Sequence, residues 1–188
     1  MSTQAPMGSI FQTLSAIFIK HSIQPVLVGG YAIIAYKIQR MTFDIDFLLT
    51  ADDFAKIESD IFALGYSVFN RQNAFVQLKS EALGLRDLDF LLSDPKTANS
   101  LIQNGRTVVI AGESFIVPSP LHLVAMKLHS VVGNKERELK DFPDIVQLLM
   151  VNEIDPASDE VKQLFVKYNA QEIYDRVLHI TNRTERRE

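Results

Sequence analysis

The sequence of 188 residues lacks several features that would narrow its function at once. It contains no cysteine, which excludes disulfides and thiolate metal ligands. Its four histidines are scattered, with no spacing typical of a zinc site. No apolar run approaches the roughly 20 residues that span a bilayer, and the first residues show no secretion-signal pattern. We therefore expect no membrane partner and a cytoplasmic location.

An excess of positive charge is also missing. The chain carries 19 basic and 23 acidic residues, a net charge of −4, which gives no support for broad binding to nucleic-acid phosphates. It is 47% hydrophobic and 22% charged, as is ordinary for a globular protein. The length suffices for one full core with a smaller appendage.

The pattern of the sequence changes near residue 118. Residues 1–117 mix helical and strand patterns, which predicts an α/β (α+β) core with a mixed sheet flanked by helices. Residues 118–188 show four helical patterns only, which predicts a C-terminal helical part. In the core we expect helices over 9–21, 31–38, 51–65 and 94–104, and strands over 26–28, 43–49, 66–70, 74–78, 86–92, 106–110 and 113–117.

Two carboxylates interrupt the apolar strand pattern FDIDFLL. Asp44 and Asp46 are two residues apart, so both project from the same face of the strand. Like charges this close cost stability unless a positive charge lies between them. An edge strand could expose both to water, but the apolar neighbours argue against a solvated face. A divalent cation removes the repulsion, and hard oxygen ligands suit Mg²⁺.

The strand pattern RDLDFLL contains a second pair, Asp87 and Asp89. Two metal ions that hold the attacking and leaving oxygens of a nucleotidyl transfer usually require a third carboxylate. Asp89 is our candidate, and Asp87 replaces it if Asp89 points to the opposite face from Asp44. We expect the carboxylates of Asp44, Asp46 and Asp89 to lie roughly 3–6 Å apart across neighbouring strands.

Gly29 and Gly30 stand between a predicted strand and a predicted helix. The first turn of a helix has unpaired N–H groups that favour an anion, and glycine lets a phosphate approach the backbone closely. The simpler alternative is a tight turn.

In their order and spacing, four segments together resemble the nucleotidyltransferase fold of the DNA polymerase β superfamily. These are GGYA at 29–32, RMTFDIDF at 40–47, SPLHLVAMKLH at 119–129 and RELKDFPDI at 137–145. The pattern, from about residue 25 to 150, is most similar to the AbiEii-like toxin family of bacterial nucleotidyltransferases. Many members of the superfamily have Gly-Ser in place of Gly-Gly, whereas antibiotic-modifying nucleotidyltransferases also have Gly-Gly. The acceptor therefore stays open.

The resemblance implies an enzyme with two Mg²⁺ ions that transfers NMP from an NTP to a hydroxyl of tRNA, a protein or a small molecule. A toxin of this kind would have an antitoxin partner. The implied roles are metal binding by Asp44, Asp46 and Asp89, catalysis by these three and Lys127, and nucleotide binding by Gly29, Gly30, Arg40, Lys127 and Asp144. The alternative function is a module of the same fold that binds nucleotide or a partner without turnover.

Four residues outside the strands keep simpler alternatives. Lys127 falls at the edge of the apolar arc of its helix, where a lysine either extends to water or faces a cleft between the two parts. Asp141 is expected as the N-cap of the next helix, and Asp144, near its third position, either stabilises the helix dipole or contacts the ligand. Arg40 could instead balance Asp44 or Asp46 as a surface pair.

Overall fold

A computed structural model describes residues 9–80, 82 and 85–185. These residues form two compact units. The first contains the chain up to Ala32 and from Met41 to Pro118, and is called the sheet unit here. The second contains Ile33–Arg40 and Ser119 onward, and is called the helical unit. The segment 33–40 thus leaves the sheet unit after the two glycines and returns just before the first acidic pair.

The elements of the sheet unit follow the predicted order. α2 differs from the prediction because it begins at Gly29 rather than Tyr31 and ends at Ala35, so that its last residues belong to the helical unit. The elements are α1 (Ile10–Lys20), β1 (Val26–Val28), α2 (Gly29–Ala35), β2 (Asp44–Thr50), α3 (Ala51–Ala63), β3 (Tyr66–Gln72), β4 (Phe75–Ser80), β5 (Asp87–Ser93), α4 (Pro95–Gln103), β6 (Arg106–Ile110) and β7 (Glu113–Val117).

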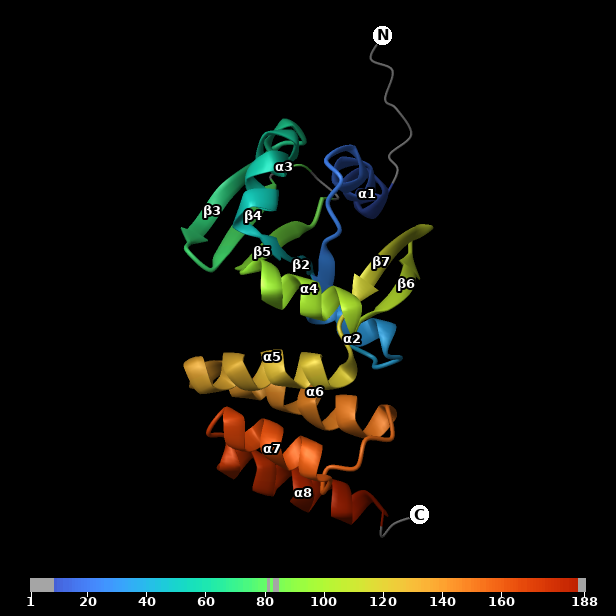
Figure 1. Ribbon diagram of the computed structural model, residues 1–188, viewed down its shortest axis with the longest axis vertical. Helices are drawn as coiled ribbons and strands as arrows, with labels where there is room; N and C mark the ends of the chain where they lie inside the picture. Colours follow the sequence, from blue (N-terminus) through green and yellow to red (C-terminus); the bar gives the residue numbers. More distant parts are fainter. Residues whose placement is uncertain (1–8, 81, 83–84, 186–188) are drawn as a thin grey trace. The chain divides into compact units, whose positions relative to one another are not determined.

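The strands join in one mixed sheet with the order β3-β4-β5-β2-β1-β7-β6 (Figure 1). β2 runs parallel to β5, and β1 parallel to β7, while the other neighbours are antiparallel. The predicted mixed sheet flanked by helices is confirmed. The parallel pairing of β2 with β5 has the greatest consequence, because it sets the two acidic strands side by side.

Aromatic side chains pack helices α1 and α3 onto one face of the sheet. The ring of Phe47 on β2 lies 5.0 Å from Phe18 of α1, and that of Phe90 on β5 lies 5.1 Å from Phe54 of α3. Burying a side chain of this size contributes about 1.5–3 kcal/mol. Because strand side chains alternate between faces, the residues next to Phe47 and Phe90 in sequence, Asp46 and Asp89, project from the opposite face.

Helix starts in the sheet unit follow their sequence signals. Asp94 accepts a hydrogen bond from the backbone N–H of Thr97 at 3.0 Å, and Pro95 occupies the first turn of α4, as predicted. The Thr97 hydroxyl also donates to the Asp94 carboxylate at 2.6 Å, and the hydrogen bonds from this hydroxyl and from the Thr97 N–H lower the pKa of Asp94. Thr50 caps α3 in the same way, through Asp53. These caps fix where the strands β2 and β5 end.

The helical unit contains the four predicted helices. They are α5 (Pro120–Gly133), α6 (Glu138–Val151), α7 (Asp159–Lys167) and α8 (Gln171–Glu185), with a 3₁₀ turn over Lys135–Arg137. Figure 1 shows α5 beside α6, and α7 beside α8. The shared core contains fully buried apolar side chains from all four helices, among them Leu128, Ile145, Phe165 and Val177.

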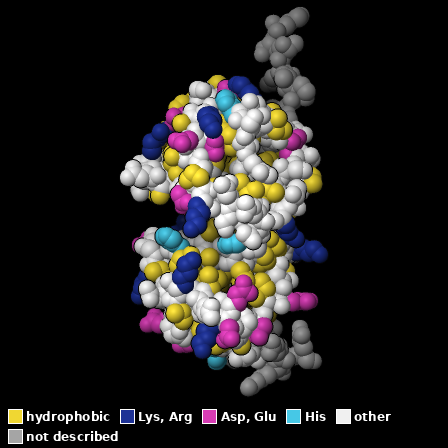
Figure 2. Space-filling model, viewed as in Figure 1, with side chains coloured by type: hydrophobic (Ala, Val, Ile, Leu, Met, Phe, Trp, Pro, Cys, Tyr) yellow, Lys and Arg dark blue, Asp and Glu magenta, His cyan; other side chains and the backbone are white. Residues whose placement is uncertain are grey.

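The surfaces of both units carry mixed charge. Figure 2 shows acidic and basic side chains interspersed on the visible face of each unit. Within residues 9–80, 82 and 85–185, no helix combines the length and apolarity that a bilayer crossing requires.

Candidate active site

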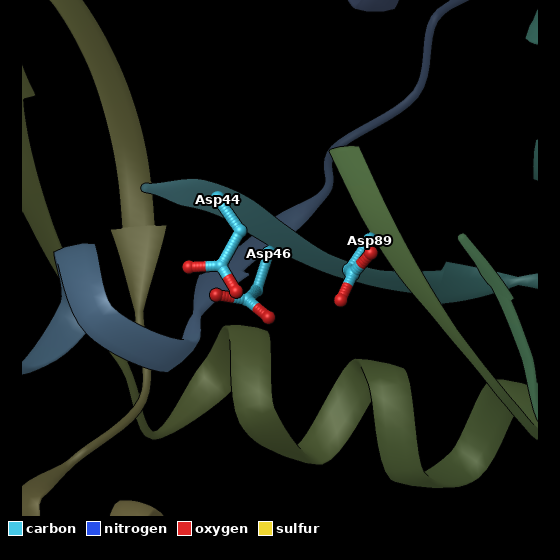
Figure 3. A group of neighbouring side chains, drawn as sticks. All are labelled: Asp44, Asp46 and Asp89. Atoms are coloured by element: carbon cyan, nitrogen blue, oxygen red, sulfur yellow. The ribbon is translucent and has the colours of Figure 1, made fainter. Parts of the chain in front are cut away.

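The three predicted metal-binding carboxylates lie together on the sheet. In the parallel register Asp46 of β2 is opposite Asp89 of β5, and Asp44 is opposite Asp87. One carboxylate oxygen each from Asp44, Asp46 and Asp89 lie within 4.8 Å of one another, and all three residues are half-buried. Figure 3 shows the three side chains on the same side of the strands. The predicted proximity is confirmed, and Asp87 is not needed in its place.

Asp87 of β5 lies opposite Asp44 and does not belong to this group. Its charge acts on Tyr66 of β3. Burial and the nearby Asp87 carboxylate together raise the pKa of Tyr66 to about 12, because both disfavour a phenolate. The neutral hydroxyl donates a hydrogen bond to the carbonyl of Arg86 at 2.7 Å, which ties the start of β5 to β3.

The two glycines make room for side chains of the site. Gly29 has φ +61°, and a Cβ at this position would lie 1.9 Å from Oδ2 of Asp46. A Cβ on Gly30 would lie 2.3 Å from Oγ1 of Thr42. A larger residue would clash at both positions, and at Gly29 the positive φ adds backbone strain. The sequence did not reveal this reason, because it depends on two contacts across 12 to 17 residues of chain.

Neutral hydrogen-bond donors hold two of the carboxylates. The Thr42 hydroxyl donates to Oδ1 of Asp44 at 2.8 Å, and Arg86 donates to the carbonyl of Thr42 at 2.8 Å. The Gln77 amide donates to Oδ2 of Asp89 at 3.0 Å. Sequence reasoning assigned no role to Thr42, Arg86 or Gln77. The alternation of Gln77 with the apolar Val76 and Leu78 is visible in the sequence. It places Gln77 beside the acidic residues only when β4 is the neighbour of β5.

The remaining predicted site residues belong to the helical unit, where they form one ion-pair cluster. The Lys127 amine lies 2.6 Å from Oδ1 of Asp141 and 2.9 Å from Oδ2 of Asp144. Arg40 pairs with the same Oδ2 of Asp144. Arg137 completes the cluster at 3.1 Å from Oδ2 of Asp141. Three cations thus surround two carboxylates.

The structure excludes one open alternative each for Lys127 and Arg40 and corrects the expected start of the helix that carries Asp141 and Asp144. Lys127 does not extend to water, because its side chain is only 9% exposed. Asp141 is not an N-cap, since α6 begins three residues earlier at Glu138, and its side chain is fully buried. Asp144, predicted near the third position of the helix, lies further along α6 for the same reason. Arg40 is not a surface pair of Asp44 or Asp46 but a largely buried partner of Asp144.

The negative charge of Asp141 is compensated within the fold. Burial alone would raise the pKa of Asp141, but the attraction and hydrogen bonds of Lys127 and then Arg137 outweigh it and lower that pKa below the usual value. A buried carboxylate is kept ionised here because its partners are equally buried or in contact with it.

The carboxylates of the sheet unit fit a divalent cation. All three donors are hard carboxylate oxygens, the kind of ligand that Mg²⁺ prefers. Their spacing is set by one strand register rather than by flexible loops, and Gly29 leaves space for the Asp46 carboxylate between strand and helix.

Comparison with known proteins identifies the fold. No protein-family model and no curated protein matches the sequence. Solved structures do match. The crystal structure of ANT(2″)-Ia in complex with adenylyl-2″-tobramycin gives a TM-score of 0.64 at 15% identity and covers 87% of this chain and 97% of that one. The chain has a nucleotidyltransferase fold.

Two further structures agree. The lincosamide antibiotic adenylyltransferase LnuA, bound to lincomycin, gives a TM-score of 0.56 at 17% identity over 79% of this chain and 99% of that one. An antigenic nucleotidyltransferase-like protein from Paracoccidioides brasiliensis gives 0.56 at 16% identity over 91% and 95%. The fold implied by the superfamily resemblance is thus confirmed, and the narrower resemblance to the AbiEii-like group stays a prediction.

Proposed function

We propose that this protein is a Mg²⁺-dependent nucleotidyltransferase, which transfers NMP from an NTP to a hydroxyl acceptor and releases pyrophosphate. One observation carries the proposal. On a nucleotidyltransferase fold, Asp44, Asp46 and Asp89 bring their carboxylate oxygens within 4.8 Å of one another on two adjacent parallel strands. Such a concentration of negative charge is costly without a cation, which gives the arrangement a chemical purpose.

The roles within the sheet unit follow from position. Asp44 and Asp46 would hold the cations that meet the triphosphate, and Asp89 would complete the ligand set on the side of the attacking hydroxyl. Bound divalent ions would neutralise the phosphate charge and lower the pKa of that hydroxyl. Gly29 and Gly30, which pack against the side chains of Asp46 and Thr42, would bring their backbone amides to the phosphates.

The ion-pair cluster of the helical unit would supply positive charge and order. Arg40 and Lys127 are proposed to contact phosphates, and Asp144, which binds both, to fix their positions for the nucleotide or acceptor. The Lys127 ammonium group donates a hydrogen bond to Asp141 and forms an ion pair with Asp144. With three cations around two carboxylates, the cluster keeps a positive excess that suits an anionic ligand.

A small molecule is the acceptor that we propose first. A net charge of −4 does not favour RNA, and two of the similar structures contain an adenylylated tobramycin and lincomycin. A tRNA 3′ end and a protein side chain are the other acceptors to be tested. Either would fit a toxin of the AbiEii-like kind with an antitoxin partner.

Transfer of label from each of the four α-³²P-NTPs tests the proposal. The protein is incubated with Mg²⁺ and, in parallel, with a panel of aminoglycosides and lincosamides, with bulk tRNA, and with cell lysate. We expect label in the small-molecule fraction from the wild type and none from Asp46→Asn. Label in RNA or protein would change the acceptor and keep the reaction. Nucleotide binding without label in any fraction would instead support a non-catalytic binding module.

A further inference from the structure

We propose that Gln77, itself held by Asn70, is a positioning residue that fixes the orientation of the Asp89 carboxylate for metal binding. The inference rests on the proposed function, since it gives Asp89 its ligand role. Neither Gln77 nor Asn70 touches the predicted reacting groups, and both act through Asp89.

The sheet register places these residues in a single row. Gln77 of β4 is directly opposite Asp89 of β5, and Asp89 is opposite Asp46 of β2. On the other side, Asn70 of β3 is opposite Gln77. The row therefore crosses four adjacent strands, and all its members project from the face opposite to the phenylalanine core.

Hydrogen bonds run along this row toward the carboxylate. The Asn70 amide nitrogen donates to Oε1 of Gln77 at 3.2 Å. The Gln77 amide nitrogen donates in turn to Oδ2 of Asp89 at 3.0 Å. Because Asn70 binds the oxygen of the Gln77 amide, it determines which end of that amide is directed at Asp89. The donor is thereby fixed, and the carboxylate has one preferred rotation.

The choice of a neutral donor is the informative feature. A cation opposite Asp89 would orient it equally well but would compete with a metal ion for its charge. β4 does carry a lysine on the same face, Lys79, which lies two residues further along, toward Asp87 rather than Asp89. The Lys79 amine lies 3.6 Å from the centre of the Phe69 ring. An amide thus faces the proposed metal ligand, whereas the lysine on the same face of β4 contacts an aromatic ring.

Groups that orient a metal ligand typically change metal affinity by 10- to 100-fold when removed. We therefore expect Gln77→Met, which keeps the length of the side chain and removes its hydrogen bonds, to weaken divalent-ion binding by about 10-fold or more. Gln77→Asn should do the same, because the shorter amide cannot reach Asp89. If polarity alone mattered, Gln77→Asn would bind as the wild type does.

The test is a Mn²⁺ titration of the nucleotide-free protein followed by electron paramagnetic resonance, which counts free Mn²⁺ without any turnover. The wild type, Gln77→Met, Gln77→Asn and a matched control, Gln72→Met, are compared after circular dichroism shows that each is folded. Gln72 is an exposed residue of the edge strand β3, so its replacement should leave Mn²⁺ affinity unchanged.

The outcomes distinguish a failure of the inference about Gln77 from a failure of the proposed function. Mn²⁺ binding by the wild type, with a selective loss in both Gln77 variants, supports the inference. Equal binding by wild type and both Gln77 variants overturns it and leaves the proposed function intact. Absence of Mn²⁺ binding by the wild type also overturns the inference, whereas the proposed function fails only if the label-transfer experiment fails as well. Should Gln77→Met not fold, Asn70→Ala replaces it, with an expected loss of about 2- to 10-fold from one missing hydrogen bond.

Discussion

Each unit contains a cluster of aspartates, and the two clusters differ in the groups that contact the carboxylates. In the helical unit Asp141 and Asp144 are buried against Lys127, Arg40 and Arg137, at distances of ion pairs. In the sheet unit Asp44 and Asp89 accept hydrogen bonds from a hydroxyl and an amide. A cation cancels the charge of a carboxylate, whereas a neutral donor orients it and leaves the charge in place.

From these contacts we expect that the carboxylates of the helical cluster serve folding and that those of the sheet cluster serve a ligand. Removing one member of the helical cluster leaves a buried charge without its partner, so the cost should fall on folding. Removing one member of the sheet cluster relieves repulsion, so the cost should fall on the reaction. The predictions below test this division, from the largest expected effect to the smallest.

The largest effect is expected for Asp44→Asn. Loss of one metal ligand removes several kcal/mol of transition-state stabilisation, which corresponds to a fall in kcat/KM on the order of 10³-fold. Its matched control is Asp87→Asn, the same change at the paired position on β5 and outside the group. Steady-state kinetics with a labelled NTP measures both variants. Equal losses in the two variants would show that the group has no special role.

For Lys127→Met we expect a loss of about 3–5 kcal/mol in the free energy of unfolding, because the fully buried Asp141 loses its nearest cation. Urea denaturation measures this loss. The double variant Lys127→Met/Asp141→Leu should recover most of the stability, since it no longer buries an unpaired carboxylate. If the refolded double variant has normal activity, the proposed phosphate contact of Lys127 is wrong.

Acid should weaken the helical cluster within a defined range. Burial raises the pKa of Asp141, but Lys127 and Arg137 lower it by a larger amount, so the folded-state pKa lies below the usual 3.8. The stabilisation is therefore fully present above about pH 4 and is lost as the pH falls through the lowered pKa. The difference in the free energy of unfolding between wild type and Asp141→Asn should be large at pH 7 and should decrease below pH 4. A constant difference over this range would show that the charge of Asp141 does not contribute.

The smallest effect is expected for Arg137→Met. Its side chain is 46% exposed, and its ion pair with Asp141 spans one helical turn. Solvent screens such a pair, so its loss should cost only about 0.2–1 kcal/mol in the free energy of unfolding. Comparison with Lys127→Met by urea denaturation isolates the influence of burial, because both cations bind the same carboxylate. A larger loss for Arg137→Met than for Lys127→Met would reverse our assignment of the central cation.

The sequence predicted the sheet cluster better than the helical one, for physical reasons. Alternation of side chains along a strand gives the face of Asp44 and Asp46 directly, and apolar neighbours on β5 give that of Asp89. Only the parallel register of β2 and β5 had to be added. Gln77 was missed because its contact depends on which strand neighbours which, and Thr42 because it precedes β2, where strand alternation does not give its direction.

The helical cluster depended on tertiary packing that the helical period does not encode. The FPD segment suggested a helix start, but α6 begins earlier and continues through Pro143, so Asp141 became an interior residue. Lys127 at the margin of an apolar arc can be exposed or buried, and the buried carboxylates on α6 decide between these. Arg40 joins this cluster only because residues 33–40 pack with the C-terminal helices.

The melting temperatures of wild type and Asp44→Asn, each with and without Mg²⁺ and NTP, test the central claim most directly. A ligand that binds only the folded state raises stability by RT ln(1 + [L]/Kd). The account predicts that, without Mg²⁺, Asp44→Asn melts at or above the temperature of the wild type, because one repelling charge is gone. With Mg²⁺ and NTP the wild type should gain stability and the variant should not. A wild type indifferent to Mg²⁺, together with a variant that melts lower in its absence, would show that the carboxylates of the sheet unit are structural and contradict the account.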